Sequence, residues 1–194
     1  MKGLIAALLL IGLAACAPRT PASYDSAGVD GLAQTIASLS PKVAPQEANA
    51  AAALAFATTR RLSAAYQITD PPLIHNAKVN AGIRPRGLCH HWAEDMQTAL
   101  TAAGFESLQI RRAIANADNP FRIEHSTAVL IAKGGSLDEG IVLDPWRNGG
   151  TLFWAKLQDD RRYDWQDRLE VLRKKGQVYI RRQSDAPPAE PIDD

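Results

Sequence analysis

Apolar residues recur along this chain with helical spacing in its first half and with strand spacing in its second half. Three segments of the first half, 46–66, 71–81 and 89–103, have an apolar stripe with the period of an α-helix. The second segment begins with two prolines after Asp70, and the third is followed by Gly104, as expected of helix starts and ends. Each segment therefore predicts a helix.

Strand-like segments follow at 108–114, 123–132, 140–144 and 177–182. Between the last two, residues 164–175 again have helical spacing, and Gly176 follows them. Helices first and strands afterwards predict an α+β fold, with N-terminal helices followed by an antiparallel β-sheet.

The N-terminus carries an export signal. Lys2 precedes an uncharged apolar run, 3–13, which is shorter than the roughly 20 residues that span a bilayer. The run ends in Leu13-Ala14-Ala15-Cys16, which resembles the lipobox of bacterial lipoproteins. The alternative is an ordinary signal peptide with a chance cysteine. We expect residues 1–15 to be removed and Cys16 to be lipidated. An alanine after the cysteine favours anchoring in the outer membrane, facing the periplasm.

Composition divides the rest of the chain. Residues 16–30 are rich in Pro, Ser and Ala and predict a flexible tether, 31–182 form the domain, and 183–194 predict a disordered tail of prolines and acids. The chain of 194 residues suits one domain with a sizeable core. Its formal charge of +1 falls to zero without Lys2, so no basic excess indicates a nucleic-acid partner.

Cysteine usage points to chemistry. The chain has two cysteines, and lipidation of Cys16 leaves Cys89 without a partner for an internal disulfide. Cys89 lies in the first turn of the helix predicted over 89–103, where unpaired N–H groups and the helix dipole favour a thiolate. It is therefore a candidate nucleophile.

A nucleophilic thiol needs a base, and the base needs an orienting group. His125 lies near the start of a predicted strand that could pack beside the helix of Cys89, and Asp144 ends the next strand. A tight hairpin turning on Gly134-Gly135 would place His125 directly opposite Asp144. The acidic residues 138 and 139 indicate a longer loop or a bulge, which would slip this register.

These residues carry a family resemblance. The segment Gly87-Leu88-Cys89-His90-His91-Trp92-Ala93 is similar to the cysteine-helix motif of transglutaminase-like proteins. His125 and Val142-Leu143-Asp144-Pro145 resemble the histidine and aspartate motifs of that superfamily, over about 88–146 in all. The resemblance implies a papain/transglutaminase-like core and a Cys-His-Asp triad, as in bacterial transglutaminase-like cysteine proteinases. Cys89 would be the nucleophile, His125 the base and Asp144 the orienting acid.

The implied function is that of a membrane-anchored thiol enzyme of the cell envelope. It would act on peptide or amide bonds through an acyl-thioester, with hydrolysis favoured over crosslinking, and without a cofactor or a metal. Its partners would be a peptide or protein substrate and the membrane. The Cys89 backbone N–H is one candidate oxyanion donor, and Gln67, Asn76 or Asn80 could supply the second.

Two other interpretations stay open. Cys89 could be an inert core residue, His125 a buried histidine and Asp144 a turn cap before Pro145, which would make the domain an inactive binding module. A zinc site formed by Cys89, His91 and His125 is a weaker alternative. Cys-x-His on one helical turn does not aim both side chains at one point, and the sequence has no second CxxC or HxxxH pair.

Overall fold

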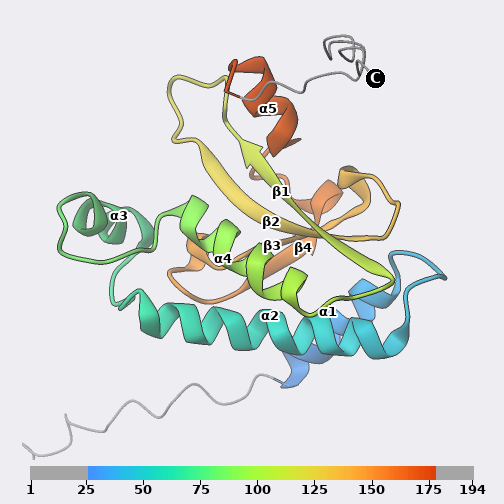
Figure 1. Cartoon of the computed structure of the whole chain (residues 1–194). Coiled ribbons are helices and arrows are strands. Elements are labelled where there is room, and N and C mark those ends of the chain that lie inside the picture. The colour runs from blue at the N-terminus through green and yellow to red at the C-terminus, as the bar shows by residue number, and fades with distance from the viewer. Residues whose placement is uncertain (1–25, 178–194) are drawn as a thin grey trace, which may run out of the picture.

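The computed structural model describes residues 26–177, in which four helices precede a five-stranded antiparallel sheet and a fifth helix follows it (Figure 1). The helices are α1 (Ser26–Ala37), α2 (Pro45–Ala65), α3 (Pro72–Asn80), α4 (Cys89–Ala102) and α5 (Arg168–Lys174). The strands are β1 (Leu108–Ala115), β2 (His125–Ala132), β3 (Ile141–Asp144), β4 (Phe153–Lys156) and β5 (Trp165–Asp167). Short 3₁₀ turns lie between the later strands: η1 (Leu137–Glu139), η2 (Trp146–Asn148) and η3 (Leu157–Asp159).

The α+β class is confirmed, and α2, α3, α4, β1, β2 and β3 match the predicted segments to within two residues at each end. The prediction over 164–175 is wrong in its first half. Residues 165–167 form β5, and the helix begins only at Arg168, because the Asp167 side chain accepts the N–H of Leu169 at 2.8 Å and caps the helix there.

Besides β5, one strand and one helix were not predicted. Strand β4 pairs along the edge of β3, and α1 begins at Ser26, inside the range 16–30 predicted as a tether. The buried stripe of α1, which includes Leu32 and Ile36, fixes that segment to the domain. Cys16, residues 178–182 of the predicted last strand, and the predicted tail lie outside the described residues.

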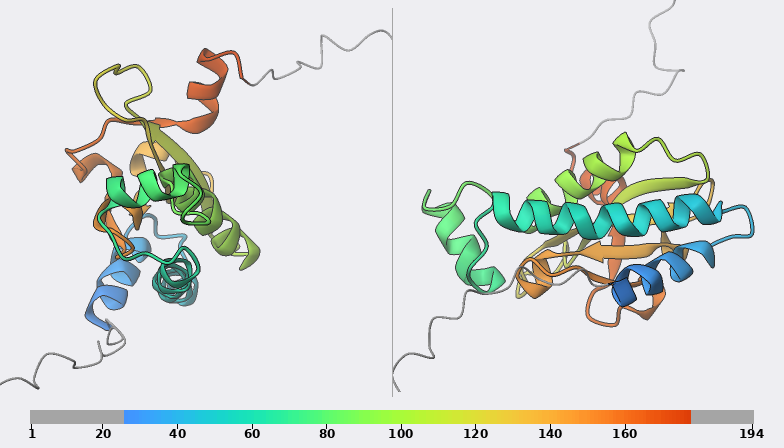
Figure 2. Two further views of the ribbon diagram at one scale, coloured as in Figure 1. Left: turned by 90° about the vertical axis from the view of Figure 1, so that its left-hand side faces the viewer. Right: turned by 90° about the horizontal axis from the view of Figure 1, so that it is seen from below.

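The sheet has the order β4-β3-β2-β1-β5, and every neighbouring pair is antiparallel. Helix α4 packs against β1 and β2, while α1 and α2 lie side by side on the same side of the sheet (Figures 1 and 2). The main core fills this space, with Met96 and Leu100 of α4 against Leu130 and Leu143 of the sheet. Burial on both faces explains why β2 reads as an almost unbroken apolar run.

A second core cluster lies on the opposite face of the sheet, where Ala113, Val129, Val142 and Trp165 are buried. Side chains alternate along a strand, so His125 shares this face with Val129. The helix of Cys89 covers the other face. A cysteine and a histidine on opposite sides of a sheet can meet only around the end of a strand, and the candidate site lies at that end of β2.

Helix α3 projects to one side of this body, beyond the N-terminal end of α4 (Figure 1), and packs against η2. A third apolar cluster connects the end of α2, α4 and η2 through Leu62, Tyr66, Trp92 and Trp146, with Cys89 packed against it. Over residues 26–177, no helix combines the length and apolarity needed to cross a bilayer.

Candidate active site

His125 and Asp144 form a buried pair. The Nε2 of His125 donates to Oδ2 of Asp144 at 2.7 Å, and the two side chains are 2% and 1% exposed. His125 opens β2 and Asp144 is the last residue of β3, so adjacent central strands hold both groups. The sequence predicted that His125 and Asp144 lie close enough to bond, and the structure shows this bond.

The register of the two strands differs from the tight-hairpin prediction. Leu130 pairs with Ile141 and Ala128 with Leu143, which places Asp144 opposite Thr127 rather than opposite His125. The connection is longer because Leu137–Glu139 forms η1, where Glu139 accepts from the backbone and the hydroxyl of Ser136. A slip of two residues keeps every side chain on its face, so the imidazole and the carboxylate still meet diagonally.

Asp144 is also held by a buried arginine. Arg147 donates through Nε to Asp144 Oδ2 at 2.8 Å and through its backbone N–H to Oδ1 at 3.2 Å. The same guanidinium donates to Asp160 at 2.6 and 3.2 Å, and Asp160 accepts from Trp165 Nε1 at 2.9 Å. The carboxylates of Asp144 and Asp160 are thus paired, away from water, with the side chains of Arg147 and His125. This network fixes the orientation of the Asp144 carboxylate.

Sequence reasoning missed Arg147 and Asp160. A signal for Arg147 exists in its spacing, since a residue three places after Asp144 in a Pro-containing turn can return to that carboxylate. No local signal identifies Asp160, which reaches Arg147 only because β4 and η3 bring the chain back beside the end of β3.

Aromatic rings surround the imidazole of His125. The ring centroids of Trp146, Tyr163 and Trp165 lie 4.6, 4.7 and 5.3 Å from its own centroid. These rings exclude water from the His125–Asp144 bond and strengthen it electrostatically.

Cys89 begins α4 and is half-buried beside the same histidine. Its Sγ lies 3.8 Å from the backbone carbonyl oxygen of Glu124, the residue directly before His125. Because Nε2 is engaged by Asp144, Nδ1 is the imidazole nitrogen left to exchange a proton with the thiol. Nδ1 is buried and has no hydrogen-bond partner among the described nitrogen and oxygen atoms.

Burial alone would disfavour a charged imidazole, but the interactions of His125 with Asp144 and with Cys89 outweigh it and raise the pKa of His125 to about 9. Burial also opposes ionisation of Asp144, yet His125 and Arg147 hold the pKa of that carboxyl below its usual value. At neutral pH the pair is therefore imidazolium and carboxylate, with the imidazolium next to the thiol.

The start of α4 is fixed by two histidines that were not predicted to do so. The Nε2 of His75 lies 2.9 Å from the Arg86 carbonyl oxygen, and a Cβ at Gly87 would come within 2.3 Å of that nitrogen. The Nδ1 of His91 accepts the backbone N–H groups of Gly87 and Leu88 at 3.2 and 3.3 Å. Burial, followed by the charges of neighbouring groups, lowers the pKa of His91 to about 4, which keeps it neutral for this role.

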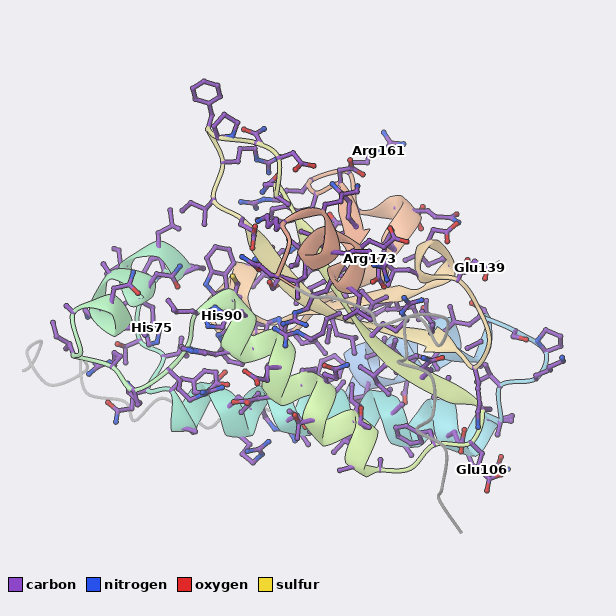
Figure 3. The ribbon with its side chains drawn as sticks, turned by 45° about the horizontal axis from the view of Figure 1, so that its top comes forward. His75, His90, Glu106, Glu139, Arg161 and Arg173 are labelled. Carbon is purple, nitrogen blue, oxygen red and sulfur yellow. The ribbon has the colours of Figure 1, made fainter. Side chains whose placement is uncertain are left out.

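The structure does not group the residues of the alternative zinc site. His91 caps its own helix through Nδ1 and does not join Cys89 and His125, and within residues 26–177 no three acidic, histidine or cysteine side chains are grouped to hold a metal. Figure 3 shows His90 at the start of α4 and His75 on the neighbouring α3.

The Cys89 backbone N–H donates to no acceptor among the described residues, as expected of a first-turn position. Of the three side chains considered as a second oxyanion donor, Asn76 contacts a residue of the site, because its Oδ1 accepts from Trp146 Nε1 at 3.0 Å. Gln67 and Asn80 are exposed.

A cavity of about 420 Å³ opens beside the imidazole. His125 and Trp146 form its inner wall, α3 contributes Pro72 and Leu73, and residues near the β1–β2 loop and Tyr163 form the other side. Its size is in the range of small-ligand sites. A substrate group could therefore reach the histidine from this side.

No family model, curated protein or solved structure matches the chain.

Proposed function

We propose that this protein is a thiol enzyme of the bacterial cell envelope, with a papain/transglutaminase-like core, held to the outer membrane through a lipid on Cys16. It acts on peptide or amide bonds through Cys89, His125 and Asp144. The resemblance of the motifs around these three residues supports the assignment.

One observation carries the proposal. A buried imidazole is bound to a carboxylate through one nitrogen and lies beside a thiol at a helix N-terminus with the other nitrogen free. His75 also has a buried Nδ1 without a hydrogen-bond partner, but within residues 26–177 only the imidazole of His125 combines a carboxylate on one nitrogen with a neighbouring thiol. The unpaired Nδ1, the neighbouring thiol and the cavity beside the imidazole are parts that a cysteine acyl-transfer site needs.

The chemistry follows from the charges. The Cys89 thiolate attacks the carbonyl carbon of the substrate, and the Cys89 backbone N–H donates to the developing oxyanion. The C–N bond then breaks as the imidazolium of His125 gives its proton to the leaving amine, leaving an acyl-thioester. Neutral His125 next takes a proton from water, the hydroxide displaces Sγ from the acyl carbon, and the products are the acid and the free enzyme. Asp144 keeps Nε2 occupied throughout, so Nδ1 handles the proton.

Thiol labelling tests the proposal. We expect iodoacetamide to modify Cys89 of the native protein rapidly, and to do so below about pH 7, where an ordinary thiol is almost wholly protonated. Mass spectrometry of the Cys89 peptide separates this reaction from any at Cys16. His125→Ala should slow the labelling below pH 7 and move its pH dependence upward.

His90→Ala is the matched control, because His90 follows Cys89 directly but is exposed, and its ring contacts that of His91, with centroids 4.3 Å apart. It should leave the profile unchanged. If Cys89 reacts only after denaturation, or if His125→Ala and wild type share one profile, the enzyme proposal fails and an inactive binding module becomes the better interpretation.

A further inference from the structure

The cavity beside His125 carries positive charge that the protein does not neutralise. Three guanidinium groups surround the ring of Tyr163, those of Arg147, Arg122 and Arg162, at 4.9, 5.3 and 5.6 Å from its centroid. Arg147 is buried and paired with two carboxylates. Neither Arg122 nor Arg162 forms an ion pair within residues 26–177.

Hydrogen bonding and contact with Tyr163 hold the two arginines that lack an ion pair, Arg122 and Arg162, at the cavity. Arg122 donates through a terminal nitrogen to the Arg162 backbone carbonyl at 3.1 Å, and both residues line the cavity together with His125. Stacking on Tyr163 restricts two long side chains that would otherwise be mobile, which lowers the entropy lost when they bind an anion. A guanidinium fork matches a carboxylate in shape as well as in charge.

The rest of the cavity is apolar. Leu73 of α3 and Ile123 before β2 both line it and are 57% and 61% exposed, so their apolar surface is accessible to a ligand. Beyond the lining, Phe121 is 95% exposed on the same β1–β2 loop. An apolar group of a ligand would cover Leu73 and Ile123, while an anionic group would meet the arginines.

We infer that the substrate is a peptide segment that carries an apolar side chain and, close to it, a side-chain or terminal carboxylate. The apolar group would lie between Leu73 and Ile123, the carboxylate on Arg122 and Arg162, and the amide to be cleaved in front of Cys89 and His125. This inference rests on the proposed function for the position of the amide, but the binding itself requires no chemistry.

Binding is therefore tested on the full chain with Cys89→Ser, which cannot form a thioester. The probes are two fluorescent tetrapeptides with blocked ends, Ala-Leu-Ala-Glu and Ala-Leu-Ala-Gln, which differ by one charge. We expect fluorescence anisotropy to show the Glu peptide binding about tenfold more tightly, as for a hydrogen-bonded charged group. That preference should shrink as salt is added.

Arg122→Gln and Arg162→Gln should each remove most of the preference for the Glu peptide. Arg161→Gln is the matched control, because Arg161, labelled in Figure 3, neighbours Arg162 in sequence and is exposed. It does not line the cavity. Leu73→Ser should weaken both peptides equally, since it removes apolar contact and no charge.

The inference would be overturned if the native site bound the two peptides equally. It would also be overturned if Arg161→Gln lost as much of the preference for the Glu peptide as Arg122→Gln and Arg162→Gln do. Full displacement of the Glu peptide by an equal concentration of inorganic phosphate would also overturn it, because the site would then bind any anion. These outcomes are separate from failure of the proposed function. A protein with an inert Cys89 could still prefer the Glu peptide, and a protein with a reactive Cys89 could show no preference.

Discussion

Replacing Asp144 with Asn tests the pair that orients the proposed base. The amide keeps the shape of the side chain but removes the charge that faces His125 Nε2 at 2.7 Å. In the native protein the pKa of His125 is raised from the ordinary 6.5 to about 9, with Asp144 the largest favourable contribution and Cys89 the next. At about 1.4 kcal/mol per pH unit, that difference corresponds to roughly 3 kcal/mol of preference for the imidazolium.

The sign of the pH effect follows from the direction of this change. A histidine whose pKa is higher in the folded protein stabilises the fold fully below pH 6.5, and this contribution is lost as the pH rises to about 9. In Asp144→Asn most of the contribution is absent at every pH. The variant should therefore be destabilised more at pH 6 than at pH 10, by up to about 3 kcal/mol. Loss of the Arg147 contact adds a cost that is nearly the same at both pH values.

Urea denaturation of both proteins at pH 6 and pH 10 measures this difference, and NMR titration of His125 should show a lower pKa in the variant than in the native protein. Asp159→Asn is a suitable control, because Asp159 is an exposed acid on η3 whose side chain forms no ion pair within residues 26–177. An equal loss of stability at both pH values in Asp144→Asn would show that Asp144 does not stabilise the imidazolium, and the reasoning would be wrong.

Three other changes have distinct expected results. Cys16→Ala should abolish acyl labelling and release the protein from the membrane fraction; unchanged fractionation would refute the lipid anchor. Cys89→Ser should abolish turnover of a peptide substrate with little change in stability, His125→Ala should cost nearly as much activity, and Asp144→Asn should cost less than either, because it leaves both reacting groups in place. Gly87→Ala should lower the free energy of unfolding by about 3 kcal/mol, since φ is +127° there and the new Cβ would clash with His75. Gly104→Ala, at a φ of +68° with open space around it, should cost about 1 kcal/mol in the same denaturation experiment.

The elements with strong local patterns were predictable. Apolar stripes indicate helices α2 and α4, prolines mark the starts of α2 and α3, and a glycine follows α4. Strand β2 is indicated by its apolar run. Strands β4 and β5 were not recognised, because four and three residues at the edges of a sheet carry too little periodicity to separate them from loop or helix.

The sequence also determined which residues belong to the candidate site, since Cys89 at a helix start and His125 and Asp144 at strand ends follow from local patterns and from their order. Only the tertiary structure decided how they meet. The connection through η1 slipped the β2–β3 register by two residues, and α4 covers the face of the sheet opposite to His125, so the thiol approaches around the end of β2. Arg147 and Asp160, which hold Asp144 in place, and Tyr163, which lines the cavity, come from the chain after β3. Their contacts depend on where β4 and β5 pair, and such long-range packing leaves no local trace in a sequence.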